Sequence, residues 1–302
     1  MRRIAALGIV ATLALTACGG GGSTTEGSAS AENNDLSYDV SSIQKVDDIA
    51  ALLPEDVASS GKLTIGAAID YAPAEFRAED LQTAIGYDVD LGKALGKVLG
   101  VETEVSAAEF ANLMPGIGST YNIGISSFTV TPERTENYNM ISYIMVGSSY
   151  AVQKGNPQGF DPNDVCGASI GVQTGTYQEE VLATMSTDCT AAGKEAIDVL
   201  SYGVQSDVTT NLIGGKVEAF FADSTVADYS VKLTNDQLEV TGGIQDAAPQ
   251  GIVVSKDDEQ LTEAMQQAMQ QLMDDGTWQA ILANWGVTED AALTTAELNP
   301  EA

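Results

Sequence analysis

The chain has 302 residues, of which 43 are acidic and 13 are basic, and its formal net charge at pH 7 is −30. This length suits a two-domain protein or one large domain. The acidity argues against nucleic acid as a partner, because phosphate binding depends on clustered Lys and Arg. The chain contains no His, which excludes Ser-His-Asp and Cys-His catalysis and His-ligated metals. We expect a binding protein without cofactor or metal.

The N-terminus has the pattern of a targeting segment. Arg2 and Arg3 precede a short apolar run, and small residues then lead to Cys18. The run is too short for a comfortable transmembrane helix. This segment resembles the lipobox of bacterial lipoproteins, in which the cysteine becomes the lipid-modified N-terminus after cleavage. The alternative is an ordinary secretory signal with an incidental cysteine.

The residues after Cys18 are rich in Gly, Ser, Thr and Glu, which is typical of a flexible tether. We expect a signal peptide over 1–17, and a lipidated Cys18 followed by a tether and a partly helical lead-in over 18–60. The domain that follows is then held at the outer face of the membrane, because several acyl chains on one cysteine anchor stably.

Alternating strands and helices follow in the next part of the chain. We expect strands over 62–66, 121–127 and 146–152, and a helix over 88–99 with Gly92 and Gly96 allowing close packing. Asp88 and Asp90 read as a solvated start of that helix.

The second half repeats this alternation. We expect strands over 168–173, 196–200, 217–222 and 251–255, and helices that begin near Thr176 and Ser206. Leu, Ala and Met residues over 261–273 follow the helical period and indicate a buried helix face. An apolar stripe over 278–285 predicts one more helix.

The alternation predicts an α/β fold with ligands at the carboxyl ends of the strands. Loop-rich stretches near 150 and 245 predict two lobes joined by two hinge crossings, with a central cleft as the natural ligand site. The expected limits are 61–150 for the first part of lobe 1, 151–245 for lobe 2, and 246–302 for the rest of lobe 1 with a C-terminal tail.

Residues 123–134 are the most informative segment, because hydroxyl side chains and an arginine follow an apolar run. Thr131 can cap a helix, Pro132 suits the first helical position, and Arg134 then lies in the first turn. The guanidinium can hold a carboxylate through two parallel hydrogen bonds. The alternative is a capped helix with a surface arginine paired to Glu136.

Two further segments have binding chemistry. The turn at Gly175 directs free N–H groups of a helix start toward an anion, although it can also be an ordinary strand–helix turn. Asp223 follows an apolar strand, so it can accept hydrogen bonds from an ammonium group or simply cap the next helix. Together with Arg134, these segments offer holders for both charges of a zwitterion.

Cys166 and Cys189 are the other two cysteines. Outside the cytoplasm such a pair predicts a disulfide, with two buried thiols as the alternative. Nothing in their spacing indicates a metal site.

Five motifs occur in the order that a known family has: GKLTIG (61–66), GYDVDL (86–91), TVTPERTE (129–136), GVQTGT (171–176) and DGTW (275–278). By these motifs the chain resembles family 3 of the extracellular solute-binding proteins of ABC importers, the polar amino acid group. The resemblance runs from about Lys62 to Val287 and implies the periplasmic-binding-protein fold.

The resemblance also implies roles for individual residues. Arg134 would bind the α-carboxylate, helped by Thr129 and by backbone groups at Thr176 and Tyr177. Asp223 would bind the α-ammonium together with Ser127. The remaining candidates for the pocket are the aromatic walls Tyr71 and Phe110, the side-chain reader Gln173, and Ser126.

The sequence departs from the family at positions that bear on the ligand. Ala74 replaces a common Phe, Ala68 stands where the family often has Asp, Asn122 stands in place of an Asp, and Tyr177 replaces a small residue. The loss of the acid at position 68 weakens the case for a basic amino acid. Glutamine, glutamate, cystine and basic amino acids stay open, with a slight preference for a neutral polar one.

We therefore expect a lipid-anchored, extracytoplasmic and monomeric receptor that captures an L-amino acid by lobe closure and delivers it to ABC permease subunits. One rival is an enzyme of the same fold, such as a dehydratase of a small carboxylate, with Glu75 or Glu109 as its acid. The other rival is a sensory module that presents its ligand to a signalling receptor.

Overall fold

The computed structural model describes residues 36–301. The predicted signal peptide, the lipidation site Cys18 and most of the tether lie outside the described residues, so they stay predictions. In the described range, no helix combines the length and apolar character needed to cross a membrane.

The centre of the fold is an eight-stranded mixed sheet with the order β5-β1-β6-β11-β7-β10-β8-β9. Its strands are β1 (Lys62–Ala67), β5 (Glu102–Ala107), β6 (Ile123–Gly124), β7 (Tyr138–Gln153), β8 (Ser169–Gln173), β9 (Asp198–Tyr202), β10 (Ala219–Asp223) and β11 (Leu238–Ser255). β5, β1 and β6 are parallel at one end, and β10, β8 and β9 are parallel at the other. The long strands β7 and β11 pair antiparallel between them.

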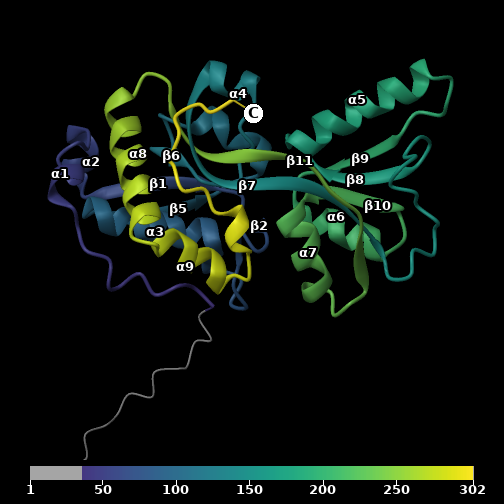
Figure 1. The fold of residues 1–302 in the computed structure, drawn as a ribbon, viewed down its shortest axis with the longest axis horizontal. Helices are drawn as coiled ribbons and strands as arrows, with labels where there is room; N and C mark the ends of the chain where they lie inside the picture. Colours follow the sequence, from purple (N-terminus) through teal and green to yellow (C-terminus); the bar gives the residue numbers. More distant parts are fainter. Residues whose placement is uncertain (1–35, 302) are drawn as a thin grey trace, which may run out of the picture. The chain divides into compact units, whose positions relative to one another are not determined.

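These two parallel groups are the centres of two lobes, and β7 and β11 are the two crossings between them (Figure 1). The fold is therefore the predicted two-lobed α/β fold. A small antiparallel sheet of β2 (Asp70–Tyr71), β3 (Glu75–Arg77) and β4 (Ala84–Ile85) follows β1 in lobe 1.

Helices pack on each parallel group (Figure 1). Lobe 1 has α1 (Asp47–Ala50), α2 (Glu55–Ser60), α3 (Tyr87–Leu99), α4 (Pro132–Asn137), α8 (Glu259–Asp274) and α9 (Thr277–Asn284), with the short 3-10 turns η1 (Phe110–Asn112), η2 (Met114–Gly116) and η3 (Glu289–Ala291). Lobe 2 has α5 (Tyr177–Ala191), α6 (Gln205–Ile213) and α7 (Ser224–Leu233).

The predicted helices are confirmed, and α3 shows why its glycines matter. A Cβ at Gly92 would lie 2.7 Å from Ile65 Cδ1, and one at Gly96 would lie 2.5 Å from Thr103 Cγ2. Both contacts are closer than van der Waals packing permits, so the glycines let α3 approach the sheet. The prediction that Asp88 and Asp90 are solvated is wrong, because they are only 1% and 0% exposed.

Asp90 accepts hydrogen bonds from the Tyr38 N–H at 2.7 Å and from Trp285 Nε1 at 2.8 Å, and it pairs with Lys93. It therefore ties the lead-in segment and the end of α9 to α3. A buried carboxylate is tolerated where donors surround it, and two of these donors, Tyr38 and Trp285, come from residues remote in sequence.

Three strand predictions need correction. The strand expected over 121–127 is only β6, because Ser127 has a left-handed φ of 49° and cannot continue it. The strand expected over 146–152 extends back to Tyr138, directly after α4. The crossing expected as a loop near 245 is part of β11, where breaks in register absorb the Gly-rich sequence.

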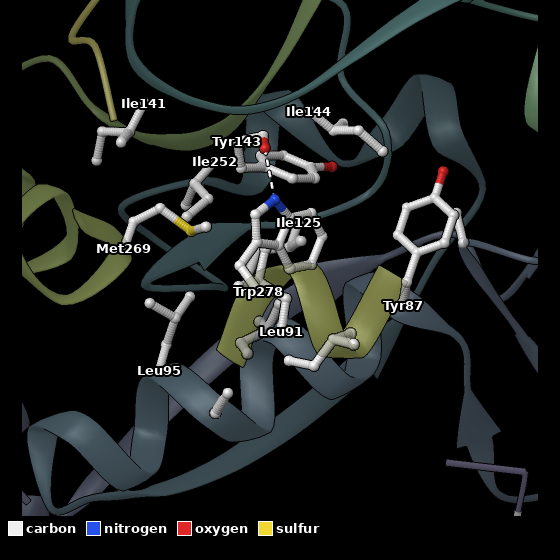
Figure 2. Close-up of a cluster of buried hydrophobic side chains, with 14 of the residues drawn as sticks. Tyr87, Leu91, Leu95, Ile125, Ile141, Tyr143, Ile144, Ile252, Met269 and Trp278 are labelled. Carbon is white, nitrogen blue, oxygen red and sulfur yellow. Dashed lines mark hydrogen bonds between the residues drawn. The ribbon is translucent and has the colours of Figure 1, made fainter. Parts of the chain in front are cut away.

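The core of lobe 1 forms where α3, α8 and α9 meet the sheet (Figure 2). Leu91 and Leu95 of α3, Met269 of α8 and Trp278 of α9 are fully buried there. Trp278 Nε1 donates a hydrogen bond to the Tyr143 carbonyl oxygen at 2.7 Å, so the indole is both packed and satisfied. The methionine stripe is core, as predicted.

Lobe 2 has a smaller apolar cluster on the face of the sheet that α5 covers. Cys166 and Cys189 form a disulfide there, with their Cα atoms 5.6 Å apart. Cys189 is 5% exposed and belongs to the same cluster. The disulfide therefore closes α5 onto the segment before β8.

Candidate functional site

Nine of the ten predicted ligand-binding residues line one cavity between the lobes. The lining consists of Tyr71, Phe110, Ser127, Thr129, Arg134, Gln173, Thr176, Tyr177, Gln178 and Asp223. Residues up to Arg134 come from lobe 1, and the others come from lobe 2. A larger groove beside β7 and β11 has Asp228, Lys232 and Asp290 in its lining. All three are exposed there, whereas the cavity combines buried charges of both signs.

Arg134 enters the cavity from the first turn of α4. The Thr131 hydroxyl accepts a hydrogen bond from the Arg134 N–H at 3.3 Å, and Pro132 is the first helical residue, as predicted. The guanidinium donates to the Thr129 carbonyl oxygen at 2.9 Å and to the Gly175 carbonyl oxygen of lobe 2 at 3.1 Å. It is 8% exposed and belongs to no ion pair in the described range. The alternative of a surface arginine paired to Glu136 is therefore wrong.

The environment of Arg134 favours an anionic partner. Burial lowers the pKa of the guanidinium, and the charges of Glu180 and Asp223 act against this shift. An arginine nevertheless keeps its charge, because its pKa in water is so high. The group has more N–H donors than its two hydrogen bonds use, and a carboxylate is the acceptor that matches the remaining fork.

Asp223 enters the cavity from the end of β10 and is 3% exposed. Its two carboxylate oxygens accept hydrogen bonds from Gln178 Nε2 and from Gln250 Nε2, each at 2.7 Å. Although Asp223 directly precedes α7, its side chain makes no capping bond to that helix. Capping is therefore not its role.

Burial raises the pKa of Asp223 to about 6, while the hydrogen bonds from the glutamines and the charge of Arg134 act in the opposite direction. The carboxylate is ionised at neutral pH but remains incompletely compensated. A cationic group placed in the cavity would supply the missing compensation.

The other cavity residues come from three elements. Phe110 stacks on Phe128 with ring centroids 5.0 Å apart, and the Arg134 guanidinium lies 5.8 Å from the centre of its ring. The Tyr71 hydroxyl accepts a hydrogen bond from the Asp223 N–H at 3.2 Å. Tyr177 is half-buried at the start of α5.

Thr176 caps α5 and donates from its hydroxyl to the Gln173 carbonyl oxygen at 2.7 Å. The turn before this helix also carries Gly175, whose carbonyl oxygen binds Arg134. Gln173 is 1% exposed, and its Oε1 has no hydrogen-bond partner in the described range.

Ser126 is the predicted residue that does not line the cavity. Its hydroxyl donates to Glu75 Oε1 at 2.6 Å and accepts from the Ala68 N–H at 3.0 Å. These bonds hold the Ser126 side chain against Glu75 and the end of β1, whereas Ser127 lines the cavity.

The sequence prediction missed the two glutamines that hold Asp223. Gln178 follows Tyr177 in the first turn of α5, where a polar side chain next to a predicted site could have drawn attention. Gln250 lies in the irregular part of β11, and no local pattern marks it. Its partner Asp223 is 27 residues away.

The cavity brings together buried side chains of opposite charge. No group of three or more metal-ligating side chains occurs among residues 36–301. The two acids considered for catalysis, Glu75 and Glu109, are absent from the lining of the cavity. Paired buried charges of opposite sign suit a small zwitterion.

The model of the bacterial extracellular solute-binding proteins, family 3, matches residues 63–288, and this chain belongs to that family. The arginine-binding protein ArgT of Corynebacterium glutamicum is 35% identical over 258 residues, which cover 85% of this chain and 84% of ArgT. The L-cystine-binding protein TcyJ of Escherichia coli K12 is 28% identical over 232 residues, which cover 76% of this chain and 84% of TcyJ.

Solved structures agree with the fold. The ancestral amino acid-binding protein AncCDT-1, a precursor of cyclohexadienyl dehydratase, superimposes with a TM-score of 0.69 at 25% identity. The match covers 78% of this chain and 99% of that structure. Its relatives thus place the chain among substrate-binding proteins, which fits a site of two opposite charges.

Proposed function

We propose that this protein captures an extracellular L-amino acid between its lobes and delivers it to the permease subunits of an ABC importer. The observation that carries the proposal is that Arg134 and Asp223, from different lobes, are buried in the lining of one cavity. Arg134 binds the α-carboxylate, with Thr129 and the start of α5, and Asp223 binds the α-ammonium, with Ser127. A monomer anchored through lipidated Cys18 at the outer face of the membrane fits this role.

Lobe closure is the proposed mechanism. Apart from contacts made by the connecting strands β7 and β11, four hydrogen-bonded residue pairs join the lobes in the described range: Arg134 with Gly175, Tyr71 with Asp223, Asp70 with Gln205, and Tyr87 with Thr225. We propose 61–150 with 246–302 and 151–245 as the bodies that separate when these contacts open. A bound zwitterion adds its own bridges, so it favours the closed form only through contacts that the open form lacks.

We propose a cationic amino acid, with L-arginine first, as the ligand. ArgT is named for arginine binding, although TcyJ is named for L-cystine binding. Ala68 removes the acid that the family often has, but Asp70 provides a carboxylate two residues further on. Burial raises its pKa to about 6, so it is ionised at neutral pH. Asp70 is not among the residues that line the cavity, and its carboxylate accepts a hydrogen bond from the Gln205 N–H, so it would act on a cationic side chain through its charge.

We propose no catalysis. A dehydratase would need an acid over the bound carboxylate. Glu75 instead accepts a hydrogen bond from Ser126 beneath the cavity, and Glu109 is exposed. Incubation with candidate carboxylates followed by product analysis would detect turnover, and any product would contradict this view.

Calorimetric titration with L-arginine, L-cystine and L-glutamine tests the proposal. The Arg134→Ala variant should bind the preferred ligand at least about a hundredfold more weakly, because it loses a buried charge-assisted pair. Arg77→Ala is the matched control, since Arg77 is the other arginine of the described range and is exposed. Equal affinity of Arg134→Ala and wild type would refute the assignment.

A further inference from the structure

Two carboxyl groups lie in direct contact beneath the cavity. Glu75 of β3 is 0% exposed and Asp88 of α3 is 1% exposed. The Asp88 N–H donates to the carbonyl oxygen of Ala74 at 2.9 Å, which brings the two side chains together, and the charge of Asp88 acts on Glu75. Neither belongs to an ion pair within residues 36–301. Two ionised carboxylates in contact without a cation are strongly disfavoured, so one of them holds a proton.

The hydrogen bonds around the pair account for each oxygen. Asp88 Oδ2 accepts from the Ser127 N–H at 2.8 Å, from the Ser127 hydroxyl at 3.3 Å and from the Tyr143 hydroxyl at 3.0 Å. Glu75 Oε1 accepts from the Ser126 hydroxyl at 2.6 Å. Glu75 Oε2 and Asp88 Oδ1 are buried and have no hydrogen-bond partner among the described residues. One proton between these two oxygens satisfies both.

The surroundings decide which residue keeps the proton. Asp88 has three donors and so is the better place for the charge, whereas Glu75 has one. Burial and the charge of Asp88 raise the pKa of Glu75 well above its usual range, and burial raises that of Asp88 only to about 6. The other titratable groups that face the pair are Asp70, Tyr87 and Tyr143.

Ser127 connects the Glu75–Asp88 pair to the cavity. It lines the cavity, is 5% exposed and has a left-handed φ of 49°. A non-glycine residue in this conformation costs free energy, and it persists only where its surroundings impose it. The charged acceptor Asp88, bonded to both its N–H and its hydroxyl, supplies that constraint.

We infer that Glu75 is a neutral carboxylic acid that donates its proton to Asp88, and that this pair is a positioning device that fixes Ser127 in its left-handed conformation. The pair acts through Ser127 and does not touch the solute. In this respect the inference rests on the proposed binding of an amino acid ammonium group by Asp223 and Ser127. The protonation of Glu75 itself does not depend on that proposal.

Conservative variants separate the two residues. Glu75→Gln keeps a donor toward Asp88 and an acceptor for Ser126, so L-arginine affinity should stay within about twofold of wild type. Asp88→Asn leaves Ser127 with a neutral acceptor in place of a charged one, so affinity should fall about tenfold. Glu104→Gln, at an exposed site on β5, is the matched control. The reverse ranking, or equal affinity in all variants, would overturn the positioning role.

Infrared difference spectroscopy at pH 8 tests whether Glu75 is protonated, and it needs no ligand. At this pH carboxyl groups with a pKa near 6 are ionised, so the C=O band of a neutral carboxylic acid should come from Glu75. The band should be present in wild type and in Glu104→Gln and absent in Glu75→Gln. A wild type without the band, or a Glu75→Gln variant that retains it, would overturn the assignment even if Asp88→Asn does not fold. If the wild-type protein binds no amino acid, the proposed function is wrong. The infrared spectrum still shows whether Glu75 is protonated.

Discussion

Arg134 and Asp223 are the two charged anchors of one cavity, but the protein holds them in different ways. Arg134 is held by backbone carbonyls and by a cap at Thr131, and most of these groups lie within five residues of it. Asp223 is held by the side chains of Gln178 and Gln250, from two other elements. The position of the Arg134 guanidinium therefore depends mainly on nearby backbone, whereas the position of the Asp223 carboxylate depends on the assembled tertiary structure. This difference can be tested by changing each support.

The largest loss of ligand affinity should come from removing the Asp223 carboxylate itself. Asp223→Ala leaves the ammonium group of the ligand buried without its partner and frees both glutamines. We expect L-arginine affinity to fall about a thousandfold, measured by calorimetry. Asp228→Ala on α7 is the control, because Asp228 is exposed. A loss below about tenfold would mean that Asp223 is a structural carboxylate.

A smaller loss of ligand affinity should follow from removing one of the two glutamines that donate to the Asp223 carboxylate. Gln250→Leu leaves one oxygen of Asp223 without its donor and should weaken binding about tenfold. Gln267→Leu, at an exposed position of α8, is the matched control. Unchanged affinity would show that Asp223 does not need its remote partner, and the contrast with Arg134 would disappear.

The pKa of Asp223 gives a pH dependence with opposite signs for binding and for folding. Its pKa lies at about 6, above its ordinary 3.8. Binding of an ammonium group needs the ionised form, so affinity should fall up to about tenfold as the pH drops from 7 to 5. Asp223→Asn should bind weakly and without this dependence, and a wild-type affinity that is constant from pH 7 to 5 would contradict the assignment.

For folding, the raised pKa means that the stabilising contribution is complete below pH 3.8 and is lost as the pH rises through about 6. Ionised Asp223 thus costs folding stability at neutral pH, by about 3 kcal/mol at most. Asp223→Asn should consequently unfold at higher denaturant concentration than wild type at pH 8, with the difference reduced at pH 4.

The smallest effect on affinity should come from the disulfide. Cys166 and Cys189 are 23 residues apart, so replacing both by Ser should cost about 3 kcal/mol of folding stability, seen in denaturant unfolding. Neither cysteine lines the cavity, so L-arginine affinity should change less than about twofold. A large loss of affinity would mean that the position of Asp223 depends on the packing of the whole of lobe 2.

The comparison also separates what could be predicted from what could not. The Thr131 cap, Pro132 and the position of Arg134 in the first turn follow from local preferences, and the structure has them as predicted. The methionine face of α8 follows from its period. By contrast, Asp88 and Asp90 looked like an ordinary acidic helix start. Their burial depends on donors such as Trp285 and Tyr143, which are far away in the sequence.

The alternation of strands and helices, the helix caps and turns, and side chains able to bind both charges of a zwitterion could be predicted from local sequence. These features depend on interactions between near neighbours in the chain. Three features came from the folded molecule alone: Ser127 and not Ser126 lines the cavity, two glutamines bind Asp223, and β7 and β11 continue from lobe to lobe. Those features depend on contacts between segments that are remote in the sequence. A local sequence pattern does not encode which side chains form hydrogen bonds across such segments, or in which register the strands pair.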